Sequence, residues 1–87
     1  MTRLWATGLP LQVQLDGRGL PAVLQLNGRR YFVERVVQQW EVDTDWWSTQ
    51  GRAWRRHYAV LTREAGPFCV VSYDVLAEEW RLERVYD

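Results

Sequence analysis

Two adjacent tryptophans, Trp46 and Trp47, stand in a polar stretch of the sequence and are followed by Arg52, Arg55 and Arg56. Because successive side chains of an extended segment point to opposite sides, both indoles cannot enter one core, and at least one is expected at the surface. Exposed indoles stack on unpaired bases, and guanidinium groups bond phosphates through two parallel hydrogen bonds. Tryptophan and arginine also dominate the energetics of protein interfaces. The cluster therefore predicts recognition rather than catalysis.

The tryptophan pair also has a plain structural interpretation, in which one indole caps the end of a barrel and the other packs over a strand. This interpretation is at least as well supported as a binding role. A second arginine pair, Arg29 and Arg30, offers another anion contact. The candidate residues for binding a protein partner or a nucleic acid are therefore Trp46, Trp47, Arg52, Arg55, Arg56, Arg29 and Arg30.

Residue types that carry catalysis are few in this sequence. His57 and Cys69 could form a nucleophile pair, but Cys69 stands in an apolar run, where a buried, unreactive cysteine is the better interpretation. Glu41, Asp43 and Asp45 offer oxygen ligands for a hard cation, yet no further ligand completes a calcium loop, which favours a solvated acidic loop. We expect no enzymatic activity, no metal and no cofactor.

The composition is that of one small soluble domain. The chain has 87 residues, and its 11 basic residues, all arginine, are balanced by 11 acidic residues, so the formal net charge is zero. This balance excludes a strong, nonspecific binder of duplex DNA. The single cysteine cannot form an intrachain disulfide, and no segment reaches the roughly 20 apolar residues of a membrane-spanning helix. We expect a cytoplasmic protein that does not enter the membrane.

The dipeptide Asn27-Gly28 is the clearest local signal of structure. Both central residues of a type I′ turn need positive φ, which asparagine tolerates and glycine adopts freely. A two-residue hairpin loop at this position places Leu24 opposite Tyr31 and puts apolar pairs on consistent faces.

Beyond this hairpin the apolar alternation changes phase, because Tyr31 and Val33 share one parity whereas Val36 and Trp40 share the other. A bulge near residues 34–35 would reconcile the two patterns and would bend the strand enough to serve both walls of a small barrel. A short helix ending at Trp40 fits the same spacing. We favour the bent strand because β-branched and aromatic residues fill the segment.

The remaining apolar runs predict further short strands at residues 11–15, 54–62, 68–75 and 79–86. The predicted fold is therefore mainly β, with five to six antiparallel strands in a highly curved sheet or partly closed barrel, SH3-like or OB-like. We expect residues 1–8 to form an N-terminal tail and residues 9–87 to form the single domain. The polar residues 43–51 are the longest predicted connection.

Four blocks of sequence carry a resemblance to a known family: Asn27-Gly28-Arg29-Arg30-Tyr31-x-Val33-x-x-Val36-x-x-x-Trp40, then Trp46-Trp47, then Tyr58-x-Val60, and finally Trp80-x-Leu82-Glu83-Arg84-Val85-Tyr86-Asp87. In this order they resemble a small bacterial domain of unknown function that occurs alone or near the C-terminus of Y-family, translesion-type DNA polymerase homologues. The resemblance implies an accessory role in DNA damage tolerance. It brings no catalytic residues, and the chain has no polymerase palm.

Together these patterns predict a non-enzymatic accessory module in DNA repair or lesion bypass. Its favoured ligand is a protein partner contacted through the aromatic and arginine residues. The first alternative is single-stranded DNA, bound by tryptophan stacking and arginine–phosphate contacts. The second is a homodimer that pairs through an exposed strand edge.

Overall fold

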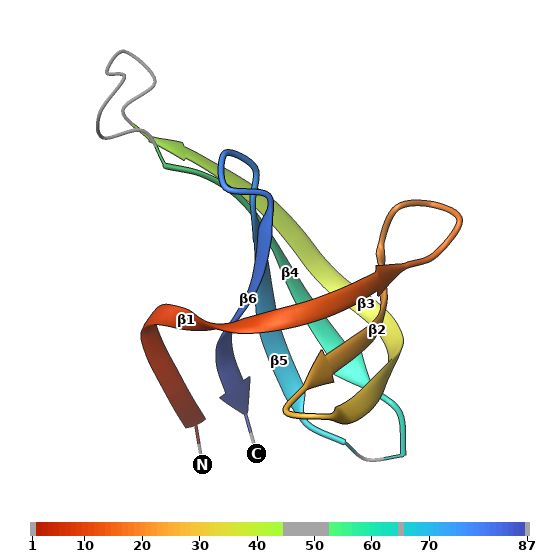
Figure 1. Cartoon of the computed structure of the whole chain (residues 1–87). Coiled ribbons are helices and arrows are strands. Elements are labelled where there is room, and N and C mark those ends of the chain that lie inside the picture. The colour runs from red at the N-terminus through yellow and green to blue at the C-terminus, as the bar shows by residue number, and fades with distance from the viewer. Residues whose placement is uncertain (1, 45–52, 65, 87) are drawn as a thin grey trace.

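The computed structural model describes residues 2–44, 53–64 and 66–86. They form six strands: β1 (Thr2–Leu15), β2 (Pro21–Leu26), β3 (Arg29–Thr44), β4 (Ala53–Thr62), β5 (Phe68–Asp74) and β6 (Glu79–Tyr86). Each strand runs antiparallel to the next, and β1 pairs with β6 to close a barrel (Figure 1). The predicted small, mainly-β barrel is confirmed. Its strand order follows the chain, as in a meander, and differs from the Greek-key order of the OB-like alternative.

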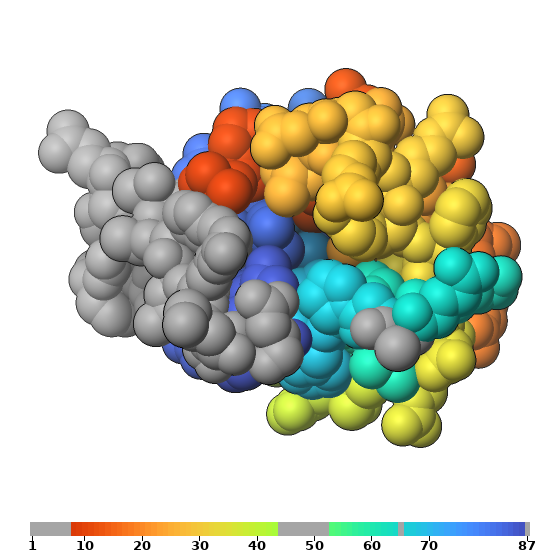
Figure 2. Space-filling view, turned by 90° about the horizontal axis from the view of Figure 1, so that it is seen from below, coloured from red at the N-terminus to blue at the C-terminus, as the bar shows by residue number. Residues whose placement is uncertain are grey.

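The β2–β3 hairpin forms as predicted. Asn27 and Gly28 have φ angles of 52° and 79°, as a type I′ turn requires, and Leu24 pairs with Tyr31. This turn and the β4–β5 connection lie at the same end of the barrel (Figure 1). In the view from that end, the β2–β3 hairpin lies above β5 in the picture, and part of β6 is visible between the two (Figure 2).

Strand β3 is one long bent strand, as favoured, and not a helix. It pairs with β2 through its first four residues and with β4 from Val33 onward. The predicted bulge is present, because the register with β4 shifts between Val33 and Arg35. A second shift, between Val36 and Gln38, was not predicted. It turns Trp40 to the outside of the barrel and leaves Val36 packed against the core.

The N-terminal segment differs from the prediction. Residues 2–8, expected to belong to a tail, continue β1, and Thr2–Leu4 pair with the last residues of β6. The two ends of the described chain therefore lie side by side (Figure 1). Gly8, with φ at 77°, marks the irregular stretch between the two ladders that join β1 to β6. No helix in the described residues is long and apolar enough to cross a membrane.

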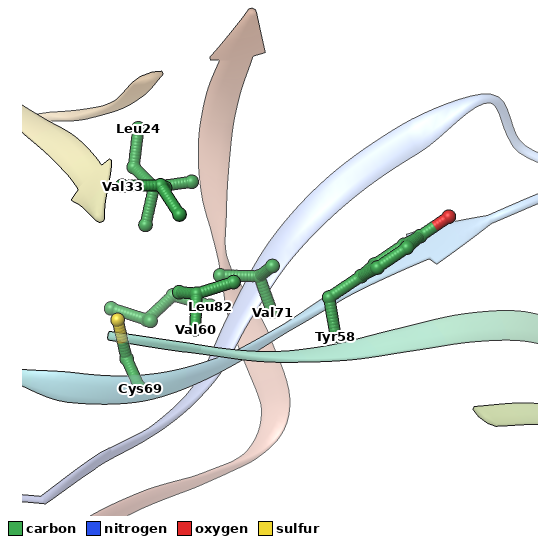
Figure 3. Packing of buried hydrophobic residues seen from close by; sticks show 7 residues of the cluster. All are labelled: Leu24, Val33, Tyr58, Val60, Cys69, Val71 and Leu82. Atoms are coloured by element: carbon green, nitrogen blue, oxygen red, sulfur yellow. The ribbon is translucent and has the colours of Figure 1, made fainter. Parts of the chain in front are cut away.

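Alternate residues of the strands point inward and form the core. The buried cluster consists of Leu24, Val33, Tyr58, Val60, Cys69, Val71 and Leu82 (Figure 3). Strand β5 is buried on both faces, as predicted for a central strand, since Val70 and Ser72 on its outer face are also buried. Burial raises the pKa of the Cys69 thiol to about 11.

Because of the turn geometry, alanine should destabilise the protein more at Gly28 than at Gly17. We expect Gly28→Ala to lower the free energy of unfolding by about 1–2 kcal/mol, because alanine resists the positive φ at this position. Gly17→Ala is the matched control, since Gly17 is not among the positive-φ residues and has open space around its Cα. Its effect should stay within about 0.5 kcal/mol. Urea unfolding of both variants checks the prediction, and equal losses would contradict it.

Candidate binding surface

Trp40 and His57 form a stacked pair on the outer face of the barrel. They are register partners on β3 and β4, their ring centroids are 5.2 Å apart, and the ring planes differ by 8°. Trp40 is 38% exposed, which makes it one of the few large apolar side chains at the surface of the described chain. The indole therefore presents one face to solvent and rests on the imidazole with the other.

Glu83 holds the imidazole from the other side. Its Oε2 lies 2.8 Å from His57 Nε2, and the two side chains are 22% and 12% exposed. His57 reaches β6 across the small residue Ser72, its register partner on β5. Glu83 is available for this contact because the β5–β6 register shifts there, which leaves Glu83 without a partner residue in the ladder. Trp40, His57 and Glu83 thus link three strands across the outer face.

Arg55 and Arg56, predicted to act together, project to opposite faces of β4. Arg55 has the parity of His57 and therefore lies on the face that carries Trp40. Arg56 is exposed, and its Nε donates a hydrogen bond of 3.1 Å to Glu41 Oε1. Strand alternation thus places Arg55 on the side of the exposed indole, whereas Arg56 is engaged by Glu41 in a shallow hollow that Trp40 and His57 also line.

The second arginine pair lies at the opposite end of β3. Arg29 and Arg30 are exposed and directly follow the hairpin turn. Along β3 they are separated from Val42, the register partner of Arg55, by up to about 40 Å at the rise of an extended strand. The structure therefore does not bring the two predicted arginine pairs together. Trp46, Trp47 and Arg52 lie outside the described residues.

Strand β3 has an open edge beside Trp40. Its ladder with β2 ends at Phe32, whereas its ladder with β4 continues to Thr44. Among the described residues, no strand pairs with the other side of β3 beyond Phe32. Residues 38–44 pair with β4 without a further shift and form the regular part of this edge. We call these residues, together with His57 and Arg55, the β3 edge surface.

The apolar alternation gives Trp40 the same parity as Val36, and no sequence pattern indicates a role for Glu83. The structure instead turns Trp40 outward and brings Glu83 against His57, because a register shift precedes Trp40 on β3 and another accompanies Glu83 on β6. A shift of one residue exchanges the two faces of a strand, and neither shift interrupts the apolar pattern in a way that the sequence shows.

The residue types of nucleophilic catalysis are present but are poorly placed for it. Cys69 points into the core, whereas His57 lies on the outer face, so they do not form the pair considered from the sequence. Ser72 faces His57 across the ladder, but it is only 2% exposed. In the part of the chain that the structure describes, no three histidine, cysteine or acidic side chains gather around a metal site; Asp45 lies outside that part.

The exposure of Trp40 predicts how much it contributes to stability. We expect Trp40→Ala to lower the free energy of unfolding by about 1–2 kcal/mol, because the side chain loses one stacking contact and limited burial. Trp80→Ala should cost about 3–5 kcal/mol, since Trp80 packs on the core and contacts the rings of Tyr58 and Tyr73. Urea unfolding separates the two, and a larger loss for Trp40→Ala would show that its indole is buried.

The sequence matches no protein-family model, and it matches no curated protein and no solved structure. The resemblance to the polymerase-associated domain therefore stays a prediction.

Proposed function

We propose that this chain is a non-enzymatic interaction module that binds a protein partner through the β3 edge surface. The observation that carries the proposal is the exposed indole of Trp40, held over His57 beside a strand edge that no described strand covers. Large aromatic side chains held in a fixed position are the usual anchors of protein interfaces.

Strand addition is the mode of binding that this geometry favours. An extended peptide that pairs with residues 38–44 would gain main-chain hydrogen bonds, and alternate side chains would supply specificity. The preceding bulges at Glu34 and Val37 disrupt the edge there, a common protection against unwanted pairing. Residues 38–44, the regular part of the edge, have about the length of an ordinary strand. The partner's strand would place side chains directly beside Trp40.

Protein is favoured over single-stranded DNA because the predicted arginines that the structure describes do not form a continuous track. Arg29 and Arg30 lie at one end of β3, Arg55 lies at the other, and Arg56 is paired with Glu41. A strand of nucleic acid needs successive positive groups along its path. The formal net charge of zero also favours a protein partner over nucleic acid. The proposed setting, DNA repair or lesion bypass, rests on the resemblance alone.

The same open edge supports a second candidate function, a homodimer. Two copies of residues 38–44 could pair antiparallel about a two-fold axis. Light scattering with size-exclusion chromatography distinguishes this candidate, because a homodimer doubles the mass at micromolar concentration, whereas a module with a foreign partner stays monomeric.

The binding prediction compares two exposed aromatic residues of the same strand. We expect Trp40→Ala to lose a partner captured by crosslinking from a lysate of the source organism, whereas Phe32→Ala retains it. Phe32 is 51% exposed but lies where β2 covers the edge. With the purified partner, Trp40→Ala should weaken binding by about 30-fold, the effect of a hot-spot residue.

A binding assay with single-stranded DNA tests the nucleic-acid alternative. Fluorescence anisotropy of a labelled oligonucleotide, measured at low and at physiological salt, should show no binding. Binding that weakens steeply with salt and is lost in Arg55→Ala would favour the nucleic-acid alternative. Equal capture of partners by wild type, Trp40→Ala and Phe32→Ala would also overturn the proposal, provided that circular dichroism shows all three folded.

A further inference from the structure

The barrel end with the β2–β3 turn, away from the β3 edge surface, contains an apolar cavity of about 490 Å³. Its apolar wall consists of Leu9, Leu11, Leu24, Leu26, Leu82 and Val85. Leu24 projects from one wall toward Cys69 and Leu82 on the facing wall (Figure 3). These three side chains are only 2–4% exposed although they line the cavity. The cavity therefore reaches the core and is more than a surface hollow.

The cavity opens to solvent at the barrel end and extends inward to buried side chains. The volume falls in the range of small-molecule sites, about 300–1,000 Å³. Water fills such a space poorly, because apolar walls offer it few hydrogen bonds. An apolar occupant would restore the missing contacts.

The lining also limits the chemistry of the occupant. Among the described residues that line the cavity, none carries a formal charge at neutral pH. Asn27 and Tyr31, both near the hairpin turn, bring the polar groups of the lining, and Cys69 brings its thiol. Burial of an ion without a countercharge is strongly unfavourable, so a charged ligand does not suit this wall.

We propose that this cavity binds an uncharged, largely apolar small molecule, with any hydrogen-bonding group of the ligand turned toward Asn27 and Tyr31. The site is independent of the proposed protein contact, because that contact uses the outer face of β3 and β4 near the other end of the barrel. A ligand here would bridge the β2–β3 hairpin to β5 and β6.

The test uses two fluorescent probes with the same ring system. N-phenyl-1-naphthylamine is uncharged, and 8-anilinonaphthalene-1-sulfonate adds one negative charge. We expect the uncharged probe to bind the wild-type chain at least about tenfold more tightly, because the cavity offers no countercharge. Stronger binding of the sulfonate would indicate an arginine-bordered surface and would overturn the proposal, as would failure of the uncharged probe to bind.

A pair of variants locates the probe. Leu26→Trp places an indole in the cavity and should weaken binding of the uncharged probe by at least about tenfold. Leu76→Trp is the control, since Leu76 is 53% exposed and does not line the cavity. It should leave binding unchanged. Unchanged binding in a folded Leu26→Trp variant would contradict the assignment.

The cysteine gives a second readout that needs no variant. Cys69 is the single cysteine and lines the cavity, so its rate of alkylation by N-ethylmaleimide reports access to that wall. Saturating uncharged probe should slow this reaction by at least about tenfold at alkaline pH, where part of the thiol is ionised. Equal rates with and without the probe would overturn the proposal even if Leu26→Trp does not fold.

Discussion

The bend in β3 is the constraint on which the rest of this structure depends. One strand of 16 residues pairs first with β2 and then with β4, and two register shifts accompany the change of partner. Bulges of this kind increase local twist and let one strand serve both walls of a small barrel. The closure of β1 on β6 then completes the ring. Without the bend, the hairpin could not fold over the remaining strands.

The register shifts also create the outer surface. The shift after Val36 turns Trp40 outward, and the shift on β6 frees Glu83 to contact His57. The resulting array fixes an exposed indole on a rigid sheet, where it loses little conformational entropy on binding. The same change of partner leaves β3 open on one side beyond Phe32. One backbone feature therefore explains both the aromatic anchor and the open edge beside it.

Much of the fold could be predicted because local signals coincided with it. Asn27-Gly28 has one favoured turn type, and the change of apolar parity after Val33 revealed the first bulge. The second shift could not be found in this way, because Val36, Trp40 and Val42 keep the same parity across it. The pairing of residues 2–4 with β6 joins the two ends of the chain, and a long-range contact of this kind leaves no periodic signal.

The candidate site was less predictable than the fold, since it depends on residues brought together from three strands. Arginine content indicated β4 as part of a site, but strand alternation separates Arg55 from Arg56, and the length of β3 separates both from Arg29 and Arg30. The functional interpretation consequently moves from a combined aromatic and basic cluster to a single indole beside an open edge. Two distinct regions are proposed as binding sites, the outer edge for a protein and the inner cavity for a small apolar molecule.

The proposed strand addition requires an open edge on β3, and amide hydrogen exchange measured by NMR on the monomeric chain shows whether that edge is open. In residues 38–44 the amides should alternate, with those directed to β4 exchanging slowly and those directed away from it exchanging rapidly. In β5, which is paired on both sides, successive amides should all exchange slowly. Uniform protection of residues 38–44 would show that another segment covers the edge and would contradict the account.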